Sequence, residues 1–187
     1  SGRRAVALSS GYDAKSACAI LDDGLLVCWG DGAYKQLGRN STTDSKVPIY
    51  VPMPANKTVV QLSASYSRIC AVMDDGTAYC WGSHTVSGCS NYGQGCPGLG
   101  DGSTQSSHTP VKMTLPTGRK VASIMNPSSA TCVTLDNGQV ACLGYGNGAG
   151  QYQKKLTLTL QYTTGTNSLT NTATPSTTVV SSYAQWV

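Results

Sequence analysis

The sequence predicts an all-β protein in which three disulfide-stapled antiparallel units are followed by further C-terminal strands. Its 187 residues include no Phe, all nine acidic residues are Asp, and only 12% of the residues are charged. Helical bundles and coiled coils need Glu, Lys, Leu and Ala on repeating faces, so these classes are excluded. A hydrophobic content of 40% with a net charge of only +4 argues against disorder. The eight cysteines, at ordered spacings, supply the second observation.

Three segments of the chain align with one another. They are residues 18–28, 70–80 and 132–142, and each has two cysteines ten positions apart around an Asp-Asp-Gly or Asp-Asn-Gly triplet. The repeat period is 52 residues and then 62, and the longer interval holds an insertion with Cys89 and Cys96. Repetition at such a period is typical of arrays of supersecondary units.

Each aligned segment is expected to form a β-hairpin with a three-residue loop. In the first segment the loop is Asp22-Asp23-Gly24, with Gly in the left-handed position. This loop places the first cysteine opposite the last, where Cα atoms of paired strands lie about 4.5–5.5 Å apart, within disulfide reach. Free buried thiols or metal ligands are the alternative, but metal sites favour closer pairs of the C-x2-C kind. We therefore expect disulfides and no metal, with these cysteines: Cys18 with Cys28, Cys70 with Cys80, Cys132 with Cys142, and Cys89 with Cys96 stapling a protruding loop.

Further short strands flank each hairpin. One strand precedes each hairpin, at residues 5–9, 59–64 and 121–125, and Pro-containing strands at 47–54 and 109–116 connect the units. Four short strands in series have the size and content of a propeller blade. We expect three blade-like units, at about 5–54, 55–116 and 117–150. Placing each connecting strand first in its blade leaves the first blade with only three strands.

The residues that carry these units resemble a known family. Residues 18–30 read C-A-x-x-D-D-G-x-x-x-C-W-G, residues 34–38 read Y-x-Q-L-G, and the second unit repeats the first of these patterns. This combination resembles the regulator-of-chromosome-condensation repeat, in the cysteine-bridged form of secreted proteins. The resemblance covers residues 5 to about 151, and the third unit lacks the Trp and the Leu-Gly. It implies β-propeller blades, usually seven to a ring, and hence a partial or open propeller here.

The resemblance does not imply the founding member's function, nucleotide exchange on a nuclear GTPase. That activity belongs to a reducing nuclear context, whereas paired cysteines indicate an oxidising one. Fold alone does not fix function.

Residues 151–187 form a Thr-rich tail whose pattern differs from the blades. Residues 156–163 alternate apolar and polar side chains, as a strand with one buried face does, and take the place of a first strand in a further blade. Residues 177–183 resemble a second strand, but no hairpin follows them. The residues expected to pair with a neighbouring chain are Leu156, Leu158, Leu160, Tyr162, Val179 and Val180.

Three interpretations of this unfinished arrangement stay open. The chain is a fragment, a compact non-propeller β domain, or a subunit whose C-terminal strands complete a neighbour's sheet. We favour the last, with copies joined head to tail in a ring or filament. The composition of the tail also suits a solvated linker or an O-glycosylated segment.

Compartment and partners follow from composition. An even cysteine count in a Ser/Thr/Gly-rich chain, with sequons at Asn40 and Asn56, predicts an extracellular or cell-surface glycoprotein. The chain has no apolar run of about 18 residues, so no membrane insertion is expected. The thinly spread charge of +4 predicts no nucleic-acid partner.

No residue pattern indicates catalysis or a cofactor. The adjacent carboxylates Asp22 and Asp23 sit in a turn that favours Asp, and no nucleophile or phosphate-loop signature is present. The first functional hypothesis is therefore a non-enzymatic extracellular structural subunit, of filament or surface-layer type. The alternative is a secreted module that recognises a glycan or protein through loop tyrosines. Those tyrosines are Tyr34, Tyr92, Tyr145 and Tyr152.

The cysteine pairing predicts a mass. Four bridges remove eight hydrogens relative to the reduced chain of eight cysteines. Intact mass spectrometry with and without a reducing agent measures this difference directly, and an unchanged mass would contradict the pairing.

Overall fold

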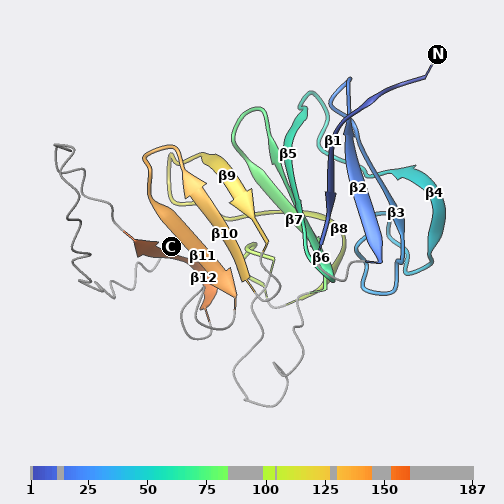
Figure 1. Ribbon diagram of the computed structural model, residues 1–187. Helices are drawn as coiled ribbons and strands as arrows, with labels where there is room; N and C mark the ends of the chain where they lie inside the picture. The colour runs from blue at the N-terminus through green and yellow to red at the C-terminus, as the bar shows by residue number, and fades with distance from the viewer. Residues whose placement is uncertain are drawn as a thin grey trace, which may run out of the picture.

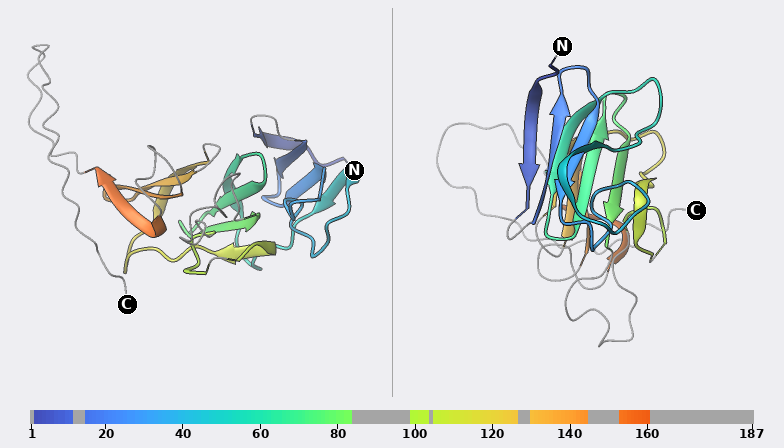
Figure 2. Two further views of the ribbon diagram at one scale, coloured as in Figure 1. Left: turned by 90° about the horizontal axis from the view of Figure 1, so that it is seen from below. Right: turned by 90° about the vertical axis from the view of Figure 1, so that its right-hand side faces the viewer.

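The computed structural model describes residues 2–11, 15–83, 99–103, 105–126, 130–144 and 153–160. These residues form three four-stranded antiparallel sheets that follow one another in chain order, as adjacent blades do (Figures 1 and 2). The described part of the chain has no helix of the length and apolarity that a membrane crossing needs.

Strand order is the same in all three sheets and follows the sequence. The first sheet consists of β1 (Ala5–Ser10), β2 (Ser16–Leu21), β3 (Leu26–Gly30) and β4 (Ser45–Tyr50). The second consists of β5 (Val59–Ala64), β6 (Arg68–Met73), β7 (Ala78–Gly82) and β8 (Ser107–Lys112). The third consists of β9 (Val121–Met125), β10 (Ala130–Leu135), β11 (Val140–Gly144) and β12 (Gln153–Leu160).

The central hairpin of each sheet has the register that cysteine spacing predicts. Cys18 pairs with Cys28 across β2 and β3, and the same positions pair in the other two hairpins. In the first loop Gly24 has a φ of 76° and donates its N–H to the Leu21 carbonyl at 2.9 Å. A left-handed φ of this kind favours glycine.

Three of the four expected disulfides are present. The S–S distances of Cys18–Cys28, Cys70–Cys80 and Cys132–Cys142 are 2.03, 2.08 and 2.11 Å. Cys89 and Cys96 lie outside the described residues.

The connecting strands belong to the preceding hairpin, which corrects the expected strand order. Tyr50 of β4 pairs with Val27, and Ile49 pairs with Cys28, so β4 completes the first sheet with a fourth strand. The strand β8 does the same for the second sheet. Each hairpin leaves one unpaired edge on its second strand, and the returning chain satisfies the hydrogen bonds of that edge.

The same rule corrects the position of the alternating Leu/Thr strand. Leu158 and Leu160 of β12 pair with Ala141 and Val140 of β11, so β12 is the last strand of the third sheet. It is not the first strand of a further blade, and the third unit reaches Leu160 rather than residue 150. Tyr162, Val179 and Val180 lie outside the described residues.

Two apolar cores fill the spaces between neighbouring sheets. The core between the first and second sheets includes Ile20, Leu37, Ile69 and Trp81, and a second cluster joins the second and third sheets. Trp81 is completely buried, and its Nε1–H donates to the carbonyl oxygen of Gln36 at 2.9 Å. The indole of the second sheet is thus fastened to the loop between β3 and β4 of the first.

Gly38 makes this attachment sterically feasible. Its φ is +68°, and a Cβ there would lie 2.8 Å from Val51 Cγ1 and 2.9 Å from Trp81 Nε1. Gly118 has a similar φ of +73° but nothing within 4 Å of the same Cβ position. Comparing the same substitution at the two glycines therefore distinguishes the cost of backbone strain from the cost of close packing.

We predict that Gly38→Ala destabilises the fold more than Gly118→Ala. Both substitutions incur a left-handed backbone cost of about 1–2 kcal/mol, and only Gly38→Ala adds overpacking of about 1–3 kcal/mol. Urea unfolding followed by circular dichroism measures the difference. Equal losses of stability in the two variants would show that the close packing against Trp81 is unimportant.

Candidate assembly surface

Neighbouring sheets are joined through their first strands, β1, β5 and β9. The Ser9 hydroxyl of β1 accepts a hydrogen bond from the Ala64 N–H of β5 at 3.0 Å. The Ser63 hydroxyl of β5 accepts one from the Asn126 N–H, directly after β9, at 2.9 Å. Ser9 and Ser63 are equivalent, because each is paired with the first cysteine of its hairpin. The same hydrogen bond, from a backbone N–H to a serine hydroxyl, therefore occurs at both junctions between sheets.

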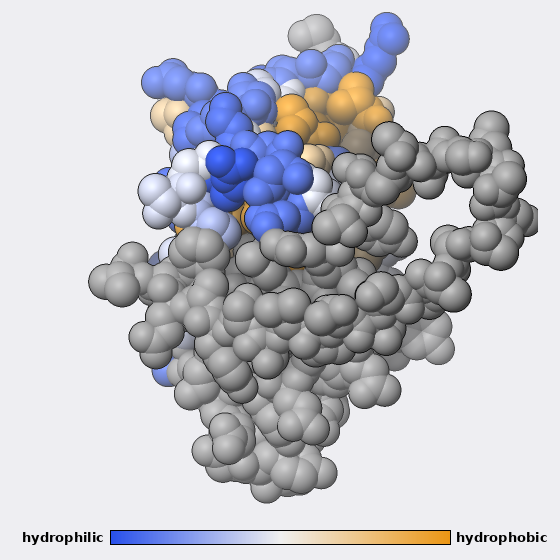
Figure 3. Space-filling view, turned by 90° about the vertical axis from the view of Figure 1, so that its left-hand side faces the viewer, coloured by the Kyte–Doolittle hydropathy of each residue, from blue (hydrophilic) through white to orange (hydrophobic). Residues whose placement is uncertain are grey.

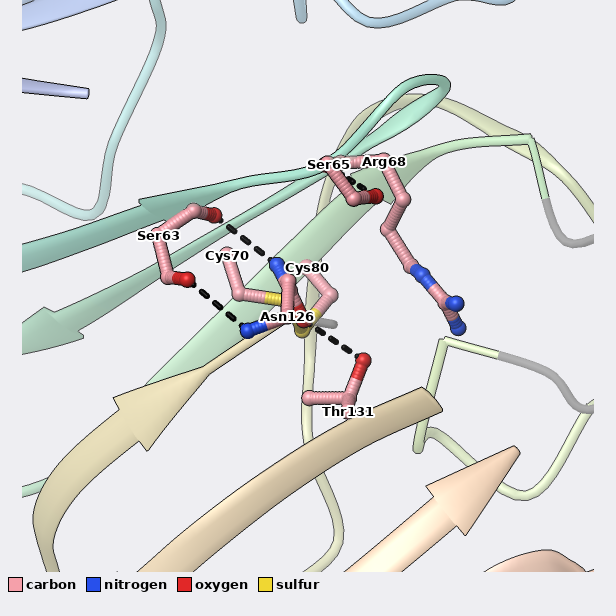
Figure 4. Close-up of a disulfide and its surroundings, with 7 residues drawn as sticks. All are labelled: Ser63, Ser65, Arg68, Cys70, Cys80, Asn126 and Thr131. Carbon is pink, nitrogen blue, oxygen red and sulfur yellow. Dashed lines mark hydrogen bonds between the residues drawn. A yellow bond between two sulfur atoms is a disulfide. The ribbon is translucent and has the colours of Figure 1, made fainter. Parts of the chain in front are cut away.

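At the junction between the second and third sheets, the buried side-chain amide of Asn126 also has hydrogen-bond partners. The Asn126 side-chain N–H donates to the Ser63 carbonyl at 2.8 Å, and its oxygen accepts from the Thr131 hydroxyl at 2.7 Å. These groups lie beside the Cys70–Cys80 disulfide (Figure 4). Because unpaired buried polar groups are costly, this pairing fixes β9 in one position on β5.

A backbone bond repeats at the hairpin turns. The Val59 N–H donates to the Gly24 carbonyl at 3.0 Å, and the Val121 N–H donates to the Gly76 carbonyl at 2.8 Å. The residue before each donor covers the turn glycine: a Cβ on Gly24 would lie 2.5 Å from the Thr58 side chain, and one on Gly76 would lie 2.6 Å from Lys120. The second and third sheets therefore each dock onto the hairpin turn of the sheet before them.

The first sheet has the docking residues but no sheet to dock on among the described residues. Leu8 is 67% exposed, whereas Leu62, at the same register, is packed against the first core. Ser10 is exposed, whereas its equivalent Ala64 is buried. Trp29 is only half-buried, although its counterpart Trp81 is inaccessible. We call this surface the leading face, defined by Leu8, Ser10 and Trp29.

Val6 does not belong to the leading face, although it is also exposed. It lies at a β-bulge, as Val60 does in the second sheet, and the two side chains are 64% and 55% exposed. Since Val60 is exposed even with a sheet docked beside it, the exposure of Val6 is a property of the bulge.

Among the described residues, the complementary surface of the third sheet is also uncovered. Met125 of β9 pairs with Cys132 and so occupies the position of Ser9 and Ser63, but it is 62% exposed. Gly138 is exposed and has nothing within 4 Å of its Cβ position, unlike the equivalent turn glycines. We call this surface the trailing face, defined by Met125, Gly138 and Cys132. Hydrophilic and apolar residues both reach the described surface on this side of the molecule (Figure 3).

The trailing face also leaves a disulfide less covered. Cys18, Cys28, Cys70 and Cys80 are completely inaccessible because each pair lies in a core facing the next sheet. Cys132 is only partly buried.

The predicted recognition and glycosylation residues are scattered. Tyr34 is 40% exposed, and its ring lies 5.3 Å from that of Tyr66. Asn40 and Asn56 are exposed, each with a positive φ. Tyr92, Tyr145 and Tyr152 lie outside the described residues. Nothing described brings Tyr34 together with the two sequons.

The turn carboxylates have structural partners. Asp75 accepts bonds from Lys57 and from the N–H and hydroxyl of Thr77, and these contacts hold the pKa of its carboxyl below the usual range. Arg68 is buried, which lowers the pKa of its guanidinium to about 10. The described residues contain no cluster of three or more His, Cys, Asp or Glu side chains suited to a metal.

Sequence reasoning placed the candidate site on the tail and overlooked the two faces. The signal was present: aligning the strands before the hairpins puts Ser9, Ser63 and Met125 in one column, and Leu8, Leu62 and Ile124 in another. The missing step was to ask which columns face a neighbouring sheet.

Comparison with known proteins agrees with the repeats. Two sequence profiles described as "Regulator of chromosome condensation (RCC1) repeat" match residues 23–72 and residues 59–94. The mitochondrial RCC1 domain-containing protein RUG3 of Arabidopsis thaliana is 30% identical over 95 residues, which are 51% of this chain and 19% of that protein. The E3 ubiquitin-protein ligase HERC2 of Homo sapiens is 29% identical over 144 residues, 76% of this chain but 3% of the ligase. The chain thus spans a small part of these relatives.

Solved structures show the same fold. Human WBSCR16 superposes with a TM-score of 0.65 at 20% identity, over 83% of this chain and 38% of that one. Yeast RCC1 (Prp20), in its complex with Kap60, gives a TM-score of 0.64 at 17% identity, over 86% and 36% of the two chains.

The partial exposure of Cys132 predicts an order of reduction. In dilute native protein, a water-soluble phosphine should open Cys132–Cys142 before Cys18–Cys28 and Cys70–Cys80, because it is the one accessible without unfolding among the three described bridges. Timed alkylation followed by peptide mapping measures the order. Simultaneous opening of all three bridges under native conditions would contradict the assigned burial, and denatured protein is the control.

Proposed function

This chain is built of RCC1-type repeats folded as β-propeller blades, and on that premise we propose that it is an extracellular structural subunit that self-assembles. Its role is to extend a disulfide-stapled row of blades by association with further copies. It acts by binding rather than by catalysis.

One observation carries this proposal: among the described residues, apolar side chains are exposed on the outward faces of the first and third sheets. Leu8 at one end and Met125 at the other are each more than 60% exposed, while the equivalent Leu62 packs in a core. Exposed apolar side chains on a docking face favour association with another surface. Contacts between two unlike surfaces of identical copies are head-to-tail, and they give a ring or an open filament.

The disulfides support the extracellular part of the proposal. Three hairpin bridges indicate an oxidising compartment. Each closes a loop with a sequence separation of 10 and contributes about 2–3 kcal/mol by the chain-entropy model. Such staples suit blades that must stay folded while their end faces are uncovered. Exposed sequons at Asn40 and Asn56 are compatible with the same route.

A recognition module is the second candidate. The observation in its favour is the Tyr34–Tyr66 pair, whose rings lie 5.3 Å apart at a loop surface. Paired aromatic rings with polar tips suit a sugar or a polar protein loop. In this case the chain would act as a monomer, and its ligand would be a glycan or protein.

The test is the solution mass of the oxidised full chain across a concentration series, measured by light scattering after size exclusion. We predict a mass that rises with concentration above the 19.4 kDa of one chain. A single-chain mass at every concentration would contradict self-assembly. If members of an oligosaccharide library also raised the melting temperature of the chain, the recognition module would be the supported function. Electron micrographs of the same samples separate rings from filaments.

A further inference from the structure

Independently of self-assembly, we propose that Tyr34 and Tyr66 form a site for a dityrosine crosslink. The two residues lie on neighbouring sheets, so a bond between their rings would tie the first sheet to the second. Each of the three described disulfides joins two strands of a single hairpin, and none of these three links one sheet to another. The crosslink would therefore add a covalent tie of a kind that the described disulfides do not supply.

The geometry of the two rings carries the proposal. Tyr34 lies in the loop between β3 and β4, and Tyr66 lies in the turn between β5 and β6. Their ring centroids are 5.3 Å apart, and the ring planes are inclined at 53°. Rings at this separation are in direct contact. Phenols couple through the ring carbons beside the hydroxyl, and for rings already in contact this requires side-chain rotation rather than a movement of either sheet.

Backbone contacts hold Tyr34 beside the second sheet. The Tyr34 N–H donates to the side-chain oxygen of Gln36 at 2.8 Å. Gln36 is buried, and its carbonyl accepts the Trp81 Nε1–H of the second sheet at 2.9 Å. The loop that carries one ring is thus fastened to the sheet that carries the other.

Contacts on the other side restrain the backbone around Tyr66. The flanking residues close a turn, because the Ser65 N–H and hydroxyl both donate to the Arg68 carbonyl, at 2.8 and 3.1 Å (Figure 4). Gly11, which follows β1, lies against this turn, and a Cβ there would be 2.4 Å from the carbonyl carbon of Ser65. Two rings held by fixed backbones react as if at high concentration, which favours coupling within one chain over coupling between chains.

Contact with a second phenol, rather than exposure, singles out Tyr34. Its exposed fraction is 40%, and Tyr66 is partly buried beside it. Tyr50 is more exposed, at 55%, but its ring lies under the guanidinium of Arg3, whose central carbon is 5.6 Å from the ring centroid. Both Tyr34 and Tyr50 are accessible to an oxidant, and Tyr34 has a tyrosine ring next to it.

The reaction uses hydrogen peroxide and a separate haem peroxidase as the oxidant. Each phenol gives up one electron and its hydroxyl proton, which leaves one phenoxyl radical on Tyr34 and one on Tyr66. The radicals join by a carbon–carbon bond between their ortho positions, and the hydrogen on each ortho carbon then moves to the oxygen of its own ring. The pair loses two hydrogens in total, and one peroxide is reduced to two waters. The oxidising compartment that the disulfides indicate is compatible with this chemistry.

The first experiment treats the disulfide-bonded full chain with hydrogen peroxide and a haem peroxidase across a dilution series. Denaturing electrophoresis separates single-chain from two-chain products, which are then reduced and digested with trypsin. The two residues fall in peptides 16–35 and 58–68, each with one tyrosine. We expect these peptides to be linked in the single-chain product, with a loss of two hydrogens and a yield that does not change on dilution. Peptides that stay unlinked, or that are linked only in two-chain products, would overturn the inference.

Because a single-chain product needs no second copy, this result does not depend on whether the chain self-assembles. A chain that forms the link and stays monomeric would support the crosslink and contradict the proposed assembly. A chain that associates without forming the link would do the reverse.

The matched variants replace tyrosine by phenylalanine, which keeps the ring and removes the hydroxyl whose oxidation starts the reaction. We expect Tyr34→Phe and Tyr66→Phe each to lower the dityrosine fluorescence of the single-chain product at least tenfold, and Tyr50→Phe to leave it within twofold. Circular dichroism checks that the variants fold. Equal fluorescence in all three variants would assign the coupling to other tyrosines and overturn the inference.

The second experiment tests whether the bond ties the two sheets. A crosslink restricts the unfolded chain, so the crosslinked protein should unfold at a higher urea concentration than the untreated protein. Peroxide-treated Tyr34→Phe is the control for other oxidation of the chain. A midpoint of unfolding that matches this control would contradict a role in joining the first sheet to the second.

Discussion

The structure depends on one interaction: the first strand of the next sheet covers the inner face of the hairpin before it, in the first and second sheets. The disulfide of each hairpin links its two paired strands. The first strand of the next sheet packs an apolar side chain against that hairpin, and a backbone N–H beside it donates to the carbonyl of the turn glycine. Four-stranded sheets of five to eight residues per strand cannot bury both faces alone. Stacking therefore supplies what a single blade lacks, and an end without a neighbour keeps an uncovered face.

The local elements could be predicted from the sequence because their signals are short in range. Two cysteines ten residues apart with glycine at the turn allow only one hairpin register, and the structure has that register. The partner of β4 or β12 was less accessible to sequence reasoning, since an amphipathic strand fits the edge before it or the edge after it equally well. In the structure β4 pairs with β3 and β12 pairs with β11, and the residue pattern of neither strand specifies this partner.

The candidate surface was missed for a related reason. Trp29 and Trp81 occupy identical sequence contexts, yet one is half-buried and the other inaccessible. Trp81 packs against the first sheet and donates to its Gln36 carbonyl, whereas no described sheet lies beside Trp29. The difference therefore depends on the position of each blade and not on its local sequence. The replacement of serine by Met125 was visible in the alignment, but its meaning needed the knowledge that this position faces the next sheet.

Relatives that share the repeat extend far beyond the segment that aligns with this chain, so the fold carries over and their activities do not. In this chain a disulfide bridges the central hairpin of each described sheet. The most direct measurement is a reconstruction of the assembled material by electron cryomicroscopy. The account predicts that identical copies of the chain make one repeated contact throughout the assembled material. Single chains with no repeated contact between copies would contradict it.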